Sequence, residues 1–379
     1  MRLIISNAHI VSPDLDVECG SIEVEAGKIT AVFDDARALS DADQIIDAGG
    51  RYVMPGFIDI HAHGADGRDV CDNDLESIRH IAKRKLGEGV TTWLPTTLTQ
   101  PQDLLEQIAT KCAQYMSDQE YAKAPGMHVE GPYINRDNAG AQNPQYVRKP
   151  SWDELKMIVS KAPVSILSIA PDIEGALDCI DEARRAGIIC SGAHSSATHE
   201  QMRTAQKAGL THLTHFGNAM SALHHREIGM VGSGLIDEDL KMELICDGVE
   251  LCPDFIKLMF RMKSIDQLML ITDSMSGSWI DSGQVQLGGL DVIIDGGQAR
   301  LKDSGALAGS VLRFNEGLRN VSDWTGLPLS QLVKATSWNQ AQSLGLAGLG
   351  RIEPGYCADI VILNKDFSVW RTMVDGEER

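Results

Sequence analysis

Residues 55–64 read Pro-Gly-Phe-Ile-Asp-Ile-His-Ala-His-Gly, and they mark where the central fold of this chain begins. The apolar run from Tyr52 to Ile60 predicts a short buried strand. Side chains two apart on a strand point the same way, so His61 and His63 at its end can face one metal ion. Imidazole is a common ligand of zinc and similar divalent ions. The alternative is that both histidines are ordinary polar residues at the end of a strand.

The composition is that of a large globular protein, with 379 residues of which 43% are hydrophobic and 23% charged. This length suits one large barrel with a smaller attached domain. The net charge of −19 argues against a nucleic-acid partner, although local Arg or His residues can still bind a phosphate. No stretch approaches the ~20 apolar residues of a membrane span, and the first residues lack a signal-peptide pattern. The eight cysteines include no Cys-x-x-Cys pair, which predicts reduced thiols and a cytoplasmic location.

The two ends of the chain differ in pattern from its middle. Short β-type runs near both ends predict one small sheet domain built from residues 1–53 and 346–379. Between them, apolar runs and amphipathic segments alternate, which predicts an α/β fold with a parallel (β/α)₈ barrel over residues 54–345. A glycine-rich segment near 283–300 breaks this alternation and predicts an inserted β-hairpin.

Polar residues directly follow several of the predicted barrel strands. After the His-x-His pair these are Glu130, His194, His215 and Asp273. In a barrel of this kind, function gathers at the carboxyl ends of the strands. A divalent ion held by His and Glu lowers the pKa of bound water from about 15.7 to about 7, and a nearby Asp can pass its proton to a leaving amine. The pattern therefore predicts metal-assisted hydrolysis, whereas the alternative for Glu130 is a buried carboxylate paired with Lys or Arg.

Several motifs resemble those of the amidohydrolase superfamily, and within it the N-acetylglucosamine-6-phosphate deacetylases. The stretch at 55–64 is general to the superfamily, whereas His-Val-Glu-Gly-Pro-Tyr at 128–133 is more specific. The resemblance covers nearly the whole chain, with further similar segments at 192–195, 214–220, 272–273, 307–310 and 355–359. It implies an amidohydrolase-type barrel, a small β-sandwich formed by both chain ends, and a homodimer. It also implies removal of the N-acetyl group of an N-acetylhexosamine 6-phosphate, which yields acetate and the amino sugar phosphate.

The resemblance also implies roles for the strand-end residues. It makes Glu130, His194 and His215 metal ligands, adds His61 and His63 as ligands of a second ion, and makes Asp273 the catalytic residue. One or two divalent ions per subunit are therefore expected. Zinc is favoured, with iron, manganese and other divalent ions as alternatives.

The implied substrate contacts follow the family only in part. Arg226 matches an arginine that reaches the phosphate from the neighbouring subunit, a task that suits a guanidinium. Gln142 and Glu250 stand where the family has histidines, and Gly217 stands where it has an aromatic residue. The sugar is accordingly N-acetylglucosamine 6-phosphate or N-acetylgalactosamine 6-phosphate, with another N-acyl amino sugar as the alternative. The complete set of expected substrate-binding residues is Asn218, Ala219, Arg226, Gln142, Glu250 and Leu307.

Two other functions compete with this interpretation. One is hydrolysis of a different amide, such as a cyclic ureide or an N-acyl amino acid, but the cyclic-amide members usually carry a lysine between their metals. The other is a non-catalytic barrel, against which the presence of Asp273 together with every ligand candidate argues. Two further histidines are expected to support the fold or the site: His128, on the same strand face as Glu130, and His212, inside a strand.

Overall fold

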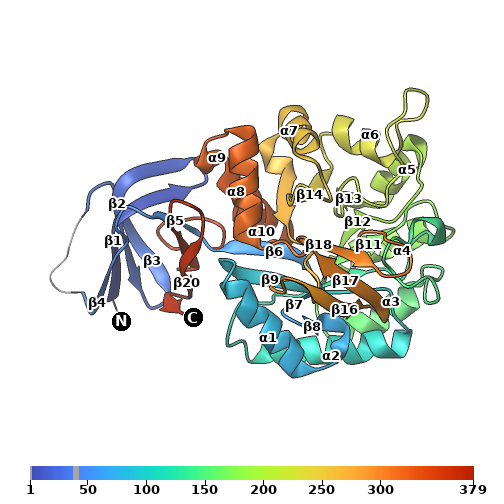
Figure 1. Cartoon of the computed structure of the whole chain (residues 1–379), viewed down its shortest axis with the longest axis horizontal. Helices are drawn as coiled ribbons and strands as arrows, with labels where there is room; N and C mark the ends of the chain where they lie inside the picture. The colour runs from blue at the N-terminus through green and yellow to red at the C-terminus, as the bar shows by residue number, and fades with distance from the viewer. Residues whose placement is uncertain (1, 37–41) are drawn as a thin grey trace.

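The structure of the chain, a computed structural model, describes residues 2–36 and 42–379. Its centre is an eight-stranded parallel sheet in which each strand pairs with the next along the chain (Figure 1). Ala62, at the end of β6, forms a parallel bridge with Ser274, which follows β15, so the first and last strands meet and the sheet closes into a barrel. The strands are β6 (Phe57–Ala62), β9 (Val90–Thr97), β10 (Met127–Glu130), β11 (Val164–Ile169), β12 (Ile189–Gly192), β13 (Leu210–Leu213), β14 (Lys241–Ile245) and β15 (Leu268–Ile271).

A helix follows each barrel strand and packs on the outside of the barrel, which confirms the predicted (β/α)₈ fold (Figure 1). In α1 the apolar residues Ile78, Ile81 and Ala82 form the buried face, as their helical spacing predicts. The helices are α1 (Leu75–Leu86), α2 (Gln102–Ser117), α3 (Trp152–Val159), α4 (Ala176–Arg185), α5 (His199–Ala208), α6 (Gly229–Ile236), α7 (Pro253–Met262) and α8 (Phe314–Thr325), with short 3₁₀ turns η1 (Val70–Asp72), η2 (Arg136–Asn138) and η3 (Ile265–Gln267).

Three short helical segments follow α8, and the second and third of them lie against β15. Asn339 and Gln340 donate side-chain hydrogen bonds to the carbonyls of Leu268 and Leu270, and Ala341 packs among the apolar side chains inside the barrel. This end of the barrel is therefore filled by protein, and the carboxyl ends of the strands are left to form the site. The segments are α9 (Leu329–Val333), the π-helical η4 (Lys334–Trp338) and α10 (Asn339–Leu344).

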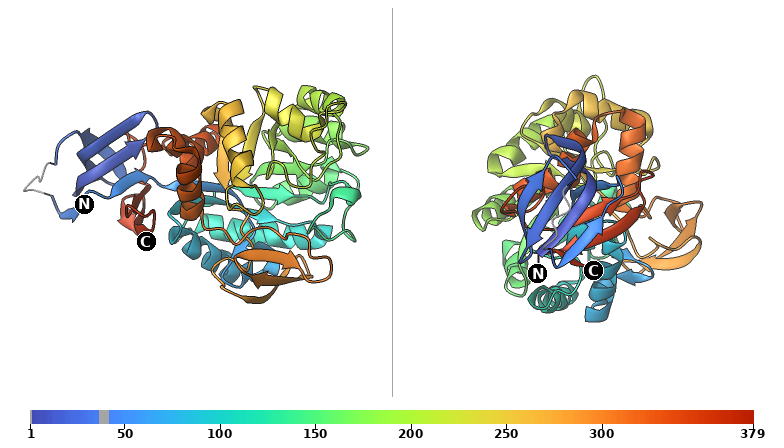
Figure 2. Two further views of the ribbon diagram at one scale, coloured as in Figure 1. Left: turned by 45° about the horizontal axis from the view of Figure 1, so that its top comes forward. Right: turned by 90° about the vertical axis from the view of Figure 1, so that its left-hand side faces the viewer.

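Both ends of the chain join one sheet beside the barrel, with its own apolar core (Figures 1 and 2). The order is β21-β20-β19-β5-β1-β2-β3, with β4 also paired to β1. Only Gly56 separates β5 from β6, so this sheet continues straight into the first barrel strand. The strands are β1 (Arg2–Ser12), β2 (Leu15–Glu25), β3 (Lys28–Phe33), β4 (Gln44–Asp47), β5 (Tyr52–Pro55), β19 (Ile360–Leu363), β20 (Val369–Val374) and β21 (Glu377–Glu378).

The insertion near 283–300 is larger than the predicted hairpin. It forms three antiparallel strands, β16 (Gly283–Leu287), β17 (Leu290–Asp295) and β18 (Gln298–Leu301), that stand out from the barrel (Figure 2). Its buried side chains pack on Leu98 and Met275, close to the ends of β9 and β15. A two-stranded ribbon, β7 (Gly64–Ala65) and β8 (Arg68–Asp69), follows the first barrel strand. No helix in the described ranges is long and apolar enough to span a membrane.

Candidate active site

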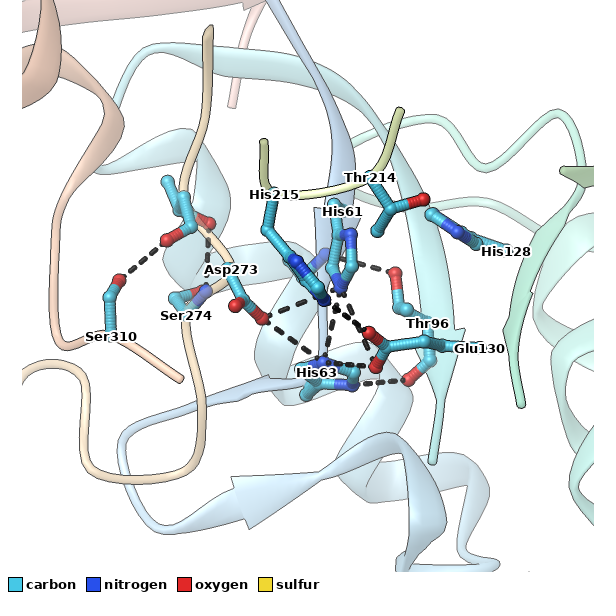
Figure 3. A network of polar contacts seen from close by, with 12 residues as sticks. His61, His63, Thr96, His128, Glu130, Thr214, His215, Asp273, Ser274 and Ser310 are labelled. Carbon is cyan, nitrogen blue, oxygen red and sulfur yellow. Dashed lines mark hydrogen bonds and ion pairs between the residues drawn. The ribbon is translucent and has the colours of Figure 1, made fainter. Parts of the chain in front are cut away.

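Six of the predicted residues meet at the carboxyl ends of the barrel strands. His61 and His63 come from the end of β6, and Glu130 is the last residue of β10. The other three follow their strands by two residues, and all three have a left-handed backbone, with φ of 44° for His194, 33° for His215 and 49° for Asp273. This conformation is uncommon for residues other than glycine and marks positions that the surrounding fold holds in place. Figure 3 shows His61, His63 and His215 directed at the carboxylate of Glu130.

The two oxygens of the buried Glu130 carboxylate serve two different groups of histidines. Oε1 lies 2.9 Å from Nε2 of His215 and 3.1 Å from Nε2 of His194. Oε2 lies 3.3 Å from Nε2 of His63 and 3.8 Å from Nε2 of His61. Glu130 therefore bridges two clusters of potential ligands.

The second cluster includes Asp273. Its Oδ1 lies 3.1 Å from Nε2 of His63 and 3.4 Å from Nε2 of His61. Burial alone lowers the pKa of His63, but the contacts with Asp273 and Glu130 outweigh it and raise the pKa to about 9. Burial likewise raises the pKa of Glu130, yet the surrounding histidines, His61 first, hold it well below its usual range. The carboxylates of Glu130 and Asp273 therefore favour a positive charge on the histidine beside them.

The spacing of the nitrogens fits metal ligands. Nε2 atoms lie 3.3 Å apart in His61 and His63, and 3.2 Å apart in His194 and His215. Nitrogen ligands of a tetrahedral ion with bonds of about 2.05 Å lie about 3.3 Å apart. Buried imidazole and carboxylate donors of this kind suit zinc and related divalent ions. The residues present therefore fit one ion in each cluster.

Protein groups on the far side of three rings fix which nitrogen faces the cluster. Nδ1 of His63 lies 3.2 Å from the carbonyl of Thr96, and Nδ1 of His194 lies 2.8 Å from the carbonyl of Asn138. A carbonyl only accepts, so each Nδ1 carries a proton and each Nε2 is the nitrogen that faces the ligand cluster. Nδ1 of His61 lies 3.0 Å from Oε2 of Glu243, a fully buried carboxylate.

Glu243 escaped the sequence analysis, although an acidic residue inside the apolar run of β14 is a detectable signal. The carboxylate, with His61 and His128, forms a third group of possible ligands. Both ring nitrogens of His128 are already engaged, Nδ1 with the carbonyl of Ile60 at 2.9 Å and Nε2 with Oγ of Ser168 at 2.7 Å. This third group is accordingly a supporting layer beneath the site.

A cavity of about 400 Å³ opens above the two clusters. It is lined by carboxylates, namely Glu130, Asp137, Glu250 and Asp273, and no Lys or Arg of the described chain lines it. Burial raises the pKa of Glu250 to about 8, and the nearby Asp273 and Asp247 add to this effect. An anionic ligand therefore meets no Lys or Arg on the described wall of this cavity. Among the predicted substrate-binding residues, those that line the cavity are Gln142, Asn218, Ala219, Glu250 and Leu307.

Gln142 and Asn218 occupy different settings within this cavity. Gln142 is buried, donates from Nε2 to Oε2 of Glu130 at 2.6 Å, and accepts at Oε1 from the backbone N–H of Thr99 at 2.7 Å. Its side chain is thus directed at the bridging carboxylate. Nδ2 of Asn218 is buried without a hydrogen-bond partner in the described structure, so it is available to an acceptor on a ligand.

Arg226 is the one predicted substrate-binding residue that does not line this cavity. It is exposed on the loop before α6, and its Nη1 lies 2.8 Å from Nε2 of His225. The structure of a single chain therefore does not bring Arg226 to the site.

The fold and the paired ligand clusters define a barrel hydrolase of the metal-dependent kind. The profile of the Amidohydrolase family matches residues 52–379, and the chain belongs to this family. An N-acetylglucosamine-6-phosphate deacetylase of Lysinibacillus sphaericus is 32% identical over 100% of this chain and 98% of its own. An N-acetylgalactosamine-6-phosphate deacetylase of Escherichia coli is 35% identical over 86% of this chain and 87% of its own.

Solved structures agree with this grouping. The crystal structure of N-acetylglucosamine-6-phosphate deacetylase from Thermotoga maritima has a TM-score of 0.90 and 36% identity, with 99% of each chain covered. The full-length relatives thus place the chain, within the amidohydrolases, among the N-acetylhexosamine-6-phosphate deacetylases.

Proposed function

We propose that this protein is a metal-dependent deacetylase that hydrolyses the N-acetyl group of an N-acetylhexosamine 6-phosphate to acetate and the amino sugar phosphate. The observation that carries the proposal is the buried Glu130 carboxylate, which joins two ligand clusters beside Asp273 at the floor of a sugar-sized cavity. The names of the full-length relatives support the substrate class.

Residues of both clusters would hold divalent ions, with zinc favoured and iron or manganese as alternatives. Oε1 of Glu130 with His194 and His215 forms one site, and Oε2 with His61 and His63 forms the other. When bound, such an ion acidifies water and polarises the amide carbonyl.

Asp273 is the residue that moves the proton. Burial raises its pKa, but His61, His63 and His215 outweigh this effect and keep the pKa below its usual range. At neutral pH its Oδ1 is therefore a carboxylate oxygen that can accept the proton of the attacking water. The same oxygen then delivers the proton to the departing amine nitrogen, which keeps the amine from leaving as an anion.

The free amide of Asn218 and the neighbouring Ala219 are proposed to bind the phosphate. The described cavity wall carries no Lys or Arg, so a second copy of the chain in a homodimer is proposed to bring Arg226 to the phosphate. Leu307 would pack against the sugar. Glu250, with a pKa near 8, binds a sugar hydroxyl in its protonated form and avoids repelling the phosphate.

Two further proposals accompany this function. Gln142, which stands where the family has a histidine, is proposed to contact the substrate near Glu130, since its amide lies between that carboxylate and the cavity. A cytoplasmic location is proposed because all eight cysteines are free thiols.

The proposal is tested by acetate release from four compounds: N-acetylglucosamine and N-acetylgalactosamine, each with and without the 6-phosphate. Metal-supplemented enzyme is expected to turn over one or both phosphorylated sugars at least tenfold faster than their unphosphorylated counterparts. The preferred epimer then shows which hydroxyl Glu250 and Gln142 recognise. Turnover of none of the four, with activity on another N-acyl amino sugar or an N-acyl amino acid, would overturn the substrate assignment.

A further inference from the structure

A lysine lies completely buried beneath the catalytic end of the barrel. Lys85, in the last turn of α1, has no exposed side-chain surface. Its Nζ lies 3.0 Å from Oδ2 of Asp59 and 3.0 Å from Oε2 of Glu88. Burial lowers the pKa of Lys85, but Glu88 and Asp59 outweigh it, so the amine keeps its proton.

The same ammonium group also contacts the two neighbours of Asp273. Nζ lies 3.1 Å from Oγ1 of Thr272 and 2.9 Å from Oγ of Ser274. The carbonyl of Ser274 in turn accepts the backbone N–H of His63 at 2.8 Å. Lys85 therefore contacts the residues on both sides of Asp273, whose backbone is in the left-handed region with φ of 49°.

Asp59, on the first barrel strand, connects that strand to the segment 272–274. Its Oδ2 accepts from Oγ1 of Thr272 at 2.6 Å, and its Oδ1 accepts from the backbone N–H groups of Thr272 at 3.2 Å and His61 at 3.3 Å. These bonds cross the seam where β6 meets β15 and the barrel closes. Glu88 anchors the other side of Lys85, since it accepts from Nε1 of Trp279 at 3.0 Å.

A buried ion pair is seldom the most stabilising choice, because desolvation opposes the attraction and apolar replacements are often as stable. Here two of the four partners of Nζ, Thr272 and Ser274, flank Asp273, and a third, Asp59, accepts the backbone N–H of His61. We propose that Lys85, acting through Asp59, Thr272 and Ser274, is a positioning residue that fixes Asp273 relative to His61 and His63. Lys85 is fully buried, does not line the cavity above the clusters, and contacts none of the reacting groups itself.

The test compares Lys85→Met with Lys123→Met in the full-length, metal-supplemented protein. Lys123 is a matched control because it also bridges two carboxylates, Asp359 at 3.0 Å and Asp375 at 2.7 Å, but lies away from the site. We expect kcat of Lys85→Met to fall by about 10- to 100-fold, the scale for a reacting group displaced by up to an ångström, with KM nearly unchanged. Lys123→Met should keep the kcat of the unmodified protein. Equal kcat in the two folded variants would overturn the inference.

The comparison of kcat values rests on the proposed deacetylation. A second measurement, which needs no substrate, is therefore made on the same variants. Hydrogen exchange of the amides at 272–275, where Asp273 donates to the carbonyl of His61 at 2.9 Å, should quicken in Lys85→Met and not in Lys123→Met. If the unmodified protein releases no acetate, the proposed function is wrong, but hydrogen exchange at residues 272–275 still tests whether Lys85 positions Asp273. Unchanged exchange at these amides would overturn this inference.

A pair of milder variants covers the case in which Lys85→Met does not fold. Thr272→Val removes the hydroxyl that contacts Asp59 and Lys85, and Thr272→Ser retains it. The Val variant should lose kcat and the Ser variant should recover most of it. Equal kcat in both variants would contradict the positioning role.

Discussion

Replacing Asp273 with Asn removes one negative charge and one proton acceptor while keeping the shape of the side chain. The backbone N–H of Asp273 still donates to the carbonyl of His61, so the loop is expected to stay in place. The substitution removes the charge and the proton-accepting ability of Oδ1. This atom lies 3.1 Å from Nε2 of His63 and 3.4 Å from Nε2 of His61, and Asp273 lines the cavity.

The size of the effect follows from the role. General acid–base catalysis contributes about 10²- to 10⁴-fold, so kcat of Asp273→Asn should fall by at least about 10², or about 2.7 kcal/mol of activation free energy. The proposed substrate-binding residues are untouched, so KM should stay nearly constant. Metal held by Glu130, His194 and His215 should remain, because Asp273 is not a member of that cluster.

The assay is steady-state acetate release with metal content measured on the same samples. Asp137→Asn is the matched control, since Asp137 lines the same cavity but is exposed and belongs to neither ligand cluster. Its kcat should match that of the unmodified protein. Near-normal turnover in Asp273→Asn would refute the assignment of the proton to this carboxylate.

Three further predictions concern binding and pH. Arg226→Ala should raise KM for the phosphorylated sugar by about 10- to 100-fold, the range for a hydrogen bond to a charged group, and spare the unphosphorylated one; an equal loss on both would show that Arg226 does not bind phosphate. Above pH 8 the ionised Glu250 should repel the phosphate, so KM should rise from pH 7 to 9 in the unmodified protein and stay flat in Glu250→Gln; parallel profiles would contradict this. Burial, with a smaller effect of Lys241, lowers the pKa of His212 to about 3, so the folded state resists protonation that the unfolded chain accepts near 6.5. This pKa difference contributes fully to the free energy of unfolding above pH 6.5. The contribution is lost as the pH falls toward 3, and the loss is about 2 kcal/mol at pH 5. The free energy of unfolding of His212→Gln, measured with urea, should lack this pH-dependent loss. If it depended on pH as strongly as in the unmodified protein, the prediction would be wrong.

The sequence patterns predicted the barrel and the six central residues because both depend on local signals. An apolar run followed at once by His, Glu or Asp marks the carboxyl end of a strand, and parallel topology then brings those ends together. His128 was likewise predicted as support, since it shares a strand face with Glu130, and the structure places it beneath the site.

Other features had no local signal. Lys85 lies in a run of basic residues that resembles a solvated helix end, and only the closed barrel reveals its contacts with Asp59 and Thr272. Helix α6 (Gly229–Ile236) contains three glycines and is buried along most of its length, so it shows no amphipathic period. The third strand of the insertion and the supporting role of Glu243 likewise depend on contacts between distant segments.

The central claim is hydrolysis of an acetamide on a phosphorylated amino sugar by a metal-loaded protein. The most direct measurement is mass spectrometry of acetate formed from N-acetylglucosamine 6-phosphate and N-acetylgalactosamine 6-phosphate in ¹⁸O-labelled water, with metal-loaded and chelated protein in parallel. The account predicts acetate with one ¹⁸O atom, an equal amount of free amino sugar phosphate, and loss of both products on chelation that added zinc restores. Absence of labelled acetate from both sugars, or equal yield after complete removal of metal, would contradict it.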